Sequence, residues 1–400
     1  MKKCNTVMSS DMHIRPLEEN DDLAQIFELC KKNDMTAENY ATNIEIWNFQ
    51  YNKNPIKKSW NSIVTENENI LGHIGLYPLP LRGAKKKFLA GSISNGVLSK
   101  SIRNKLLPFK GKKTFSIIPL IDNCASTAFQ EGADIVFAHS TIHSMIWKTL
   151  KYRKIDVTCK TTYHSGVKGL CLAYYSSLCK KRKIFSGPLG VIYSAMLTSK
   201  SILPILINRG VHFLTRNIKS DISMASFETF GVEFENLFNE FFDGNQDLVT
   251  YDRSIKYLNW KFSQSQFTKI MVTSHGKLIG YLVLQKVDGS DNFKVIDYVI
   301  LNEFIKKSAF IFNFLSNIEG INISFTHFLS CGYSNLIYEA LNKQGVELNL
   351  RPLSKLLKNQ KETKAPIYYK SNDVGSNPVP SLDQYSWFIS PIFFTPTYFK

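Results

Sequence analysis

The chain has 400 residues, which is too long for one ordinary core and fits two domains of typical size. Apolar residues make up 44% and aromatic residues 13% of the chain, as in a globular protein that can build substantial cores. The formal charge of +16 requires an anionic partner, but no zinc finger, RNP-like strand or long basic run indicates specific nucleic-acid recognition.

Cysteine usage and the N-terminus indicate a reducing compartment. The seven cysteines are scattered and odd in number, without a CxxC pair or a Cys/His cluster of zinc spacing, so we expect neither a disulfide framework nor a metal site. Polar residues rather than an apolar segment follow Met1–Cys4, so we expect no signal peptide. Together these features predict a cytoplasmic protein.

The first predicted elements form a β-hairpin. An aromatic-rich segment at 46–51 leads into an alternating strand at 62–65, and a polar turn at 66–69 leads into a strand at 70–76. Polar turn chemistry between two alternating apolar runs is typical of a hairpin.

The next elements predict parallel strand pairing. A strand at 88–98 is followed by a basic, glycine-containing loop and a helix at 112–131, then by a strand at 134–138 and a helix at 142–151. Strands joined through a helix pair in parallel.

An apolar stretch at 184–214 separates this region from the next. Proline, lysine and arginine interrupt it, and its charge-free part is shorter than the ~20 residues of a membrane-spanning helix. We expect a helical inter-domain segment at 166–220. The basic run at 180–183 favours shallow contact with anionic headgroups.

The pattern then recurs about 208 residues later, which indicates a duplicated domain rather than a solenoid of short repeats. The second copy predicts an aromatic helix end, a hairpin, and a strand–helix–strand–helix series, at 257–262, 269–272, 276–283, 293–301, 303–317, 321–328 and 334–344.

The duplication predicts an α/β protein with domains at 1–165 and 221–400 and mixed sheets flanked by helices. The polar tail at 358–380 is rich in Pro, Ser and Asn, which predicts a loop. The aromatic end at 385–389 predicts a final strand that packs on the second domain.

This order of elements resembles the GNAT superfamily of acyl-CoA-dependent N-acyltransferases, and more narrowly its two-domain bacterial members. Trp47–Pro55 resembles the tryptophan-rich segment that precedes the family's hairpin, and Ile70–Pro78 resembles its "hydrophobic-Gly-His-hydrophobic-Gly" strand. Arg103–Phe115 stands where the family has its basic pyrophosphate loop. The resemblance covers residues 10–160 and, more loosely, 220–350, and it implies two GNAT-like domains.

The resemblance assigns the donor, acetyl-CoA or another acyl-CoA, to the first domain. Backbone N–H groups at a helix start attract phosphate, glycine lets the backbone approach closely, and lysines supply charge. The pattern Arg/Gln-x-x-Gly-x-Gly/Ala is met only in part, since Leu106–Lys110 looks like an insertion. The implied donor-binding residues are Val97, Leu98, Arg103, Lys110, Gly111, Lys112, Lys113 and Thr114.

The sequence offers fewer candidates for the catalytic groups than for the donor-binding residues. Acyl transfer to an amine needs a deprotonated amine, a polarised thioester carbonyl and a proton for the leaving thiolate. Asn95 is the candidate to hold a water that accepts the proton. Trp147 stands where the family often has a tyrosine as general acid, whereas the second copy keeps Tyr338 at that position.

The resemblance therefore implies an N-acyltransferase acting on a small-molecule amine, such as an amino sugar or a surface-polysaccharide precursor. The basic run at 180–183 adds the expectation of peripheral contact at the inner membrane. Two alternatives stay open. A FemABX-like aminoacyl or peptidyl transferase would act on cell-wall precursors and bind tRNA in a salt-sensitive way. A non-catalytic binding protein on a decayed GNAT fold would explain the missing tyrosine at position 147.

Overall fold

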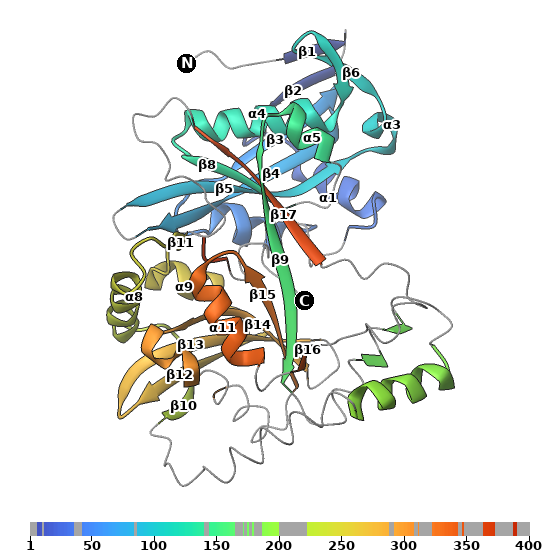
Figure 1. Cartoon of the computed structure of the whole chain (residues 1–400). Coiled ribbons are helices and arrows are strands. Elements are labelled where there is room, and N and C mark those ends of the chain that lie inside the picture. The colour runs from blue at the N-terminus through green and yellow to red at the C-terminus, as the bar shows by residue number, and fades with distance from the viewer. Residues whose placement is uncertain are drawn as a thin grey trace.

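The computed structural model describes residues 6–9, 12–35, 42–83, 86–139, 144–164, 171, 174–175, 178–179, 186–199, 222–287, 292–307, 311, 322–342, 346–347, 363–372 and 387–389. Within these residues, a 15-stranded mixed sheet runs through both halves of the protein, and a two-stranded sheet stands beside it. This arrangement confirms the mixed α/β class predicted from the sequence. Figure 1 shows the two halves one above the other.

The first half of the sheet is antiparallel except at its inner end, where β5 and β8 run parallel. The predicted hairpin is present, and its turn residues Asn67 and Glu68 both have positive φ (47° and 67°). Its strands, in sheet order, are β1 (Thr6–Ser9), β2 (Met12–Pro16), β3 (Trp60–Glu66), β4 (Asn69–Arg82), β5 (Lys87–Leu98) and β8 (Ile135–His139).

The second half repeats this plan. Its hairpin turns at His275 and Gly276, again both with positive φ (50° and 79°), and its inner strands again run parallel. Its strands are β10 (Ile222–Phe227), β12 (Phe267–Ser274), β13 (Lys277–Lys286), β14 (Asn292–Ile300) and β15 (Asn322–Leu329), while β11 (Thr250–Tyr251) pairs with β4.

Equivalent residues identify the repeat at the atomic level. Gly72 lies opposite Leu98 in the first half, as Gly280 lies opposite Ile300 in the second. The Ser99 N–H, directly after Leu98, donates to the Leu71 carbonyl at 2.8 Å. In the same way, the Leu301 N–H, directly after Ile300, donates to the Ile279 carbonyl at 2.9 Å. The two halves therefore share one pairing register at this edge.

Two long strands cross between the halves. β9 (Arg153–His164) leaves the first half and pairs with β15, while β17 (Thr363–Ser371) returns from the second half and lies between β8 and β9. Figure 1 shows β9 in green and β17 in red crossing where the halves meet. The loop predicted at 358–380 is therefore wrong for β17: pairing on both edges outweighs a sequence rich in polar residues and proline. The domain boundaries stay a prediction.

Helices cover both faces of the first half. On one face, α1 (Leu23–Lys32), α2 (Ile44–Trp47) and the π-helix η1 (Asn48–Asn52) bury a core that includes Tyr77 and Val97. On the other face, α4 (Ile117–Gln130) and α5 (Ser144–Thr149) bury a core that includes Trp60 and Leu98.

In the second half, α8 (Glu233–Asp243), α9 (Ile255–Lys261) and α11 (Gly332–Asn342) accompany the sheet. Phe49 of η1 stacks on its repeat equivalent Trp260 of α9, with ring centroids 5.1 Å apart. Short elements complete the described fold: α3 (Lys100–Arg103), β6 (Leu106–Phe109), β7 (Lys112–Phe115), η3 (Asn302–Lys307) and β16 (Val346–Glu347).

The helix predicted at 112–131 starts five residues later, at Ile117, because Lys112–Phe115 forms strand β7. Lys110 and Gly111 have φ values of 48° and 79°, which suit a two-residue hairpin turn between β6 and β7. The helix predicted at 303–317 begins as the 3-10 helix η3, and most of its remainder lies outside the described residues.

Candidate functional site

The parallel pairing between β5 and β8 covers three residue pairs, from Ala90–Ile135 to Ser92–Phe137. Asp134 fixes the paired end, since the Leu89 N–H donates to its carboxylate at 2.8 Å. Among the described residues, no further pairing joins the two strands beyond Ser92 and Phe137. The last part of β5 therefore has a sheet neighbour only on its β4 side.

A β-bulge interrupts this last part of β5. His73 lies opposite Val97 and Gly75 lies opposite Ser94, so Asn95 and Gly96 together face the single residue Ile74. A bulge turns backbone groups out of the ladder and is frequent beside active sites. The predicted residues Asn95, Val97 and Leu98 thus belong to the one irregular segment of this strand.

The predicted anion-binding residues lie on the β6–β7 hairpin and run directly into α4. Lys112 and Lys113 are exposed, and a Cβ at Gly111 would meet no atom within 4 Å. Thr114 is half-buried, and its buried Oγ1 has no hydrogen-bond partner among the described residues. The hairpin therefore presents exposed charge, and it holds a buried hydroxyl without a partner three residues before Ile117, the first residue of the helix.

The start of α4 is not capped by a side chain. Ser116 occupies the N-cap, but its hydroxyl donates to the Ile102 carbonyl at 2.7 Å instead. The first N–H groups of a helix lack intrahelical partners and carry partial positive charge, which suits a phosphate. The Thr114 hydroxyl, the first N–H groups of α4 and the nearby lysines form a chemically suitable set for a pyrophosphate.

Two predicted residues have protein partners. Lys110 Nζ lies 2.8 Å from the Asp122 carboxylate on α4. Arg103 donates to the Asn33 side chain and reaches the Leu98 carbonyl at 3.4 Å. Both side chains are exposed as well, and Lys112 and Lys113 are the exposed lysines of this hairpin whose side chains have no partner among the described residues.

A buried polar cluster that we did not predict lies on the other face of β4, beside the bulge. His73 is fully buried, and its Nε2 lies 3.1 Å from Asn61 Oδ1. A Cβ at Gly75 would collide with the Tyr51 hydroxyl and would lie 2.6 Å from Asn61 Oδ1. The Tyr51, Asn61 and His73 side chains therefore meet over the strand next to the bulge.

Lys261, at the end of α9, brings a basic group from the second half to this face. Its side chain is 3% exposed, and its Nζ lies 5.2 Å from the centroid of the Tyr77 ring on β4. Tyr77 lies opposite Ser92, where the β5–β8 pairing ends. Burial lowers the pKa of Lys261 from its ordinary 10.5 to about 7, so a neutral amine is available near neutral pH.

Asn95 and Tyr338 are not brought together. Tyr338 of α11 contacts Lys160 of β9 at 3.3 Å. β9 is three strands along from β5, roughly 14 Å at the usual strand spacing. Trp147 is buried between Tyr152 and Tyr368, with centroids 5.2 Å and 5.3 Å away, and thus fills core.

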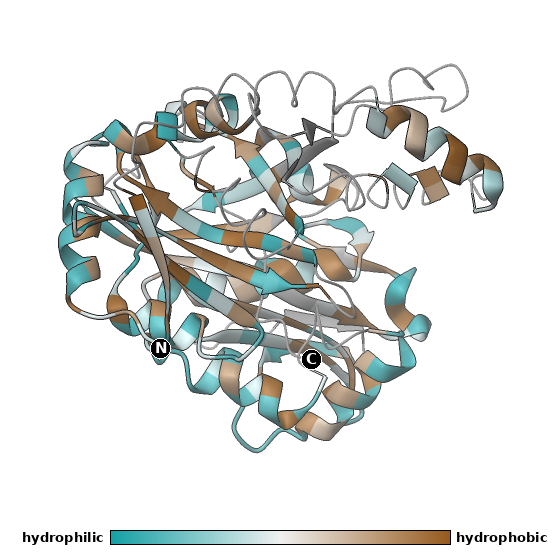
Figure 2. Cartoon of the chain, turned by 90° about the horizontal axis from the view of Figure 1, so that it is seen from below, coloured by the Kyte–Doolittle hydropathy of each residue, from teal (hydrophilic) through white to brown (hydrophobic). Residues whose placement is uncertain are grey.

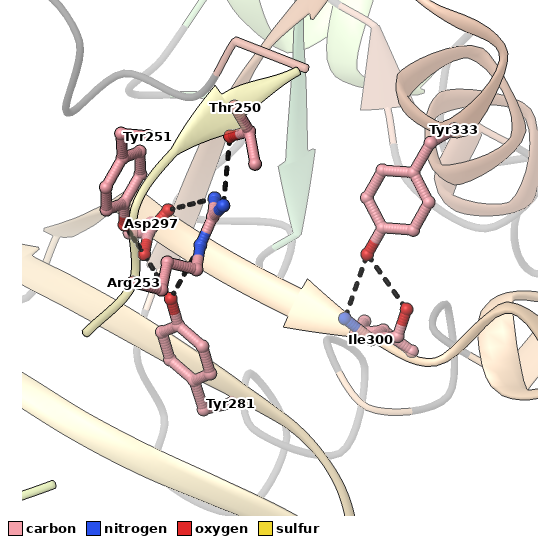
Figure 3. A network of polar contacts seen from close by, with 7 residues as sticks. All are labelled: Thr250, Tyr251, Arg253, Tyr281, Asp297, Ile300 and Tyr333. Atoms are coloured by element: carbon pink, nitrogen blue, oxygen red, sulfur yellow. Dashed lines mark hydrogen bonds and ion pairs between the residues drawn. The ribbon is translucent and has the colours of Figure 1, made fainter. Parts of the chain in front are cut away.

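The equivalent region of the second half is occupied by its own side chains (Figure 3). Counting back three residues from Ile300, as from Leu98, puts Asp297 at the position of Asn95. Asp297 forms a fully buried ion pair with Arg253 at 3.2 Å, and both Tyr251 and Tyr281 donate to it. Burial and the Asp297 carboxylate raise the pKa of Tyr281 well above its ordinary value, so this hydroxyl stays a donor.

Tyr333 closes the end of strand β14 by bonding its last residue. Its hydroxyl accepts from the Ile300 N–H and donates to the Ile300 carbonyl, both at 2.9 Å. Figure 3 shows this pair at the end of β14, beside the Arg253 network. The strand end that corresponds to Leu98 is therefore internally satisfied in the second half.

Comparison with known proteins identifies the fold. The sequence matches no family model and no curated protein. A GCN5-related N-acetyltransferase from Anabaena variabilis is similar with a TM-score of 0.53 and 9% identity, over 91% of this chain and 73% of that one. An N-acetyltransferase of the same type from Kribbella flavida gives 0.52 and 8%, over 91% and 72%.

Saccharomyces cerevisiae N-myristoyltransferase with bound myristoyl-CoA is similar with a TM-score of 0.53 and 10% identity, over 96% of this chain and 86% of that one. At such low identity these similarities show the fold alone. They confirm the GNAT acyltransferase fold that the sequence predicted.

Proposed function

We propose that this chain, which has the GNAT acyltransferase fold, is an N-acyltransferase that moves an acyl group from acyl-CoA to an amine. The observation that carries the proposal is that the first half combines three features: the bulge at Asn95–Gly96, the end of the β5–β8 pairing, and the uncapped start of α4. The GNAT-type structures to which this chain is similar include one with bound myristoyl-CoA.

The donor would lie between the bulge and α4. Lys112, Lys113, the Thr114 hydroxyl and the first N–H groups of α4 would hold the pyrophosphate. A backbone N–H near Val97 and Leu98 would donate to the thioester carbonyl, where negative charge develops during attack. Acetyl-CoA and longer acyl-CoA molecules are both candidates.

The chain's own residues would manage the protons. The acceptor's ammonium group would give a proton to the neutral amine of Lys261, directly or through a water held near Asn95. The amine nitrogen would then bond to the acyl carbon and the carbon–sulfur bond would break. The proton that this nitrogen loses as it becomes the amide would go to the leaving thiolate. Tyr338 stays a prediction, because its described contacts are with Lys160 of the crossing strand β9 and with His327 of β15.

The acceptor would be a polar small molecule that carries an amine. An amino sugar or a polysaccharide precursor follows from the sequence resemblance alone, and the buried Tyr51, Asn61 and His73 cluster supports only a polar acceptor. An aminoacyl transferase is the alternative function that the test below distinguishes.

A thermal-unfolding titration with coenzyme A, acetyl-CoA and a long-chain acyl-CoA tests the proposal. A ligand at ~100 times its dissociation constant should stabilise the protein by about 2.7 kcal/mol. Lys112→Glu with Lys113→Glu should abolish this gain, whereas Lys286→Glu with Lys294→Glu, two exposed lysines of the second half, should keep it. Absence of any gain at millimolar ligand contradicts the proposal, and salt-sensitive tRNA binding in its place supports the aminoacyl transferase.

A further inference from the structure

Residues 157–220 contain no aspartate or glutamate. The same stretch holds ten basic residues: Lys160, Lys168, Lys180, Lys181, Arg182, Lys183, Lys200, Arg209, Arg216 and Lys219. It therefore contributes +10 of the chain's formal charge of +16 from less than a fifth of its length. Such segregation concentrates the attraction for an anionic partner in one part of the chain.

A helix at 188–199 lies inside this stretch and carries no charged residue. Leu189, Ile192 and Met196 have the spacing of one helical face, and they are 51%, 63% and 51% exposed. The opposite face is buried, since Ser194 is 0% and Leu197 2% exposed. The helix thus presents an apolar outer face to its surroundings.

The same helix lies at the margin of the molecule. In Figure 1 it is the green helix at the lower right, away from the sheet, and in Figure 2 it lies at the upper right with hydrophobic residues along it. Lys200 follows its last residue directly, and Lys183 precedes Pro188 by five residues, which is at most about 18 Å of extended chain. Positive charge is therefore always close to the apolar face.

We propose that the helix at 188–199 docks this protein on an anionic membrane surface, with Leu189, Ile192 and Met196 at the boundary between headgroups and acyl chains. Apolar side chains on one helix face and basic residues beside it form the combination that binds a membrane interface. Because its apolar side chains lie on one face only, the helix would lie along the surface. Among the described residues, no helix is long and apolar enough to cross a membrane.

A nucleic acid fits these observations less well. Its phosphates would bind the basic residues, but single-stranded nucleic acid is also held by stacking of its bases on aromatic side chains. The exposed face of this helix consists of aliphatic and thioether side chains instead. An anionic membrane would bind the basic residues through its headgroups and the apolar face through its acyl chains. The docking is independent of the acyl-transfer proposal, because it uses none of the residues of the first-half site.

Sedimentation with vesicles tests the docking on the full chain. Vesicles of phosphatidylcholine with about a third phosphatidylglycerol should bind the protein, and pure phosphatidylcholine vesicles should bind it at least tenfold more weakly. Ile192→Asp with Met196→Asp should lower binding to the anionic vesicles at least tenfold. Val232→Asp with Leu336→Asp, which changes two apolar residues that are 72% and 53% exposed elsewhere, should leave binding unchanged.

Four results would overturn the proposal. The wild-type chain could fail to bind anionic vesicles, or the Ile192 and Met196 variant could bind them as tightly as wild type. A concentration-dependent dimer that this variant abolishes, without vesicle binding, would show that a second copy covers the face. Binding of RNA that does not need Ile192 or Met196, without vesicle binding, would assign the basic stretch to nucleic acid.

Discussion

Replacement of Lys261 by methionine measures the burial of this amine directly. Methionine has a similar length and no charge, so Lys261→Met keeps the packing against Tyr77 and removes the titrating group. Below about pH 7 the lysine is protonated in the folded and the unfolded chain, and the folded state carries the full cost of a buried charge. Methionine carries no such cost.

The sign of the pH dependence follows from proton binding. Between about pH 7 and 10.5 the unfolded chain holds a proton on Lys261 that the folded chain does not, so wild-type stability rises with pH. The Lys261 Nζ faces the rings of Tyr77 and, on its own helix, Trp260, with centroids 5.2 Å and 5.7 Å away.

The magnitude follows from the two pKa values. The interval from 10.5 to about 7, at 1.36 kcal/mol per pKa unit, corresponds to roughly 5 kcal/mol. We therefore expect Lys261→Met to be more stable than wild type at low pH, and its advantage to shrink by up to about 5 kcal/mol as pH rises towards 10.

Urea unfolding of both proteins, followed by tryptophan fluorescence from about pH 6 to about pH 10, gives this difference at each pH. Lys256→Met is the matched control, because it removes a lysine from an exposed position of the same helix. A difference between Lys261→Met and wild type that stays constant over this range would refute the reasoning and remove Lys261 as a base.

Three further predictions concern the second half and are read from chemical denaturation. Tyr333→Phe should lower the free energy of unfolding by about 1–3 kcal/mol, because Ile300 loses both hydrogen bonds to the hydroxyl; an unchanged value contradicts the closure described above. Arg253→Leu should cost about 3–5 kcal/mol by leaving Asp297 charged and buried, and a cost under about 1 kcal/mol would show that the pair is not maintained. Gly280→Ala should lower the free energy of unfolding by about 1–3 kcal/mol, because the added Cβ would lie 2.5 Å from a backbone oxygen of β14. An unchanged free energy of unfolding would mean that β13 and β14 can move apart to accept the methyl group.

Local patterns predicted much of the fold. The turns at Asn67–Glu68 and His275–Gly276 are encoded by a few adjacent polar residues, so both hairpins followed from alternation and turn chemistry. The crossing of β9 and β17 could not follow in this way, because each strand pairs with partners that lie far along the chain. A Pro-containing segment such as Thr363–Ser371 reads locally as a loop.

The candidate site was predicted in the same uneven way. The basic, glycine-containing character of residues 110–114 was visible, but the hairpin that they form depends on positive φ at Lys110 and Gly111. Lys261 was missed because burial is not a local property. One signal was present: Lys261 occupies the position that the uncharged Gln50 holds in the first copy, and both side chains are buried.

Isothermal titration calorimetry with acyl-CoA tests most directly whether the first half alone holds the donor. The account predicts one molecule bound per chain, with binding lost in Lys112→Glu with Lys113→Glu and kept in Tyr333→Phe. Two molecules per chain, or binding that survives the lysine changes and disappears in Tyr333→Phe, would contradict it.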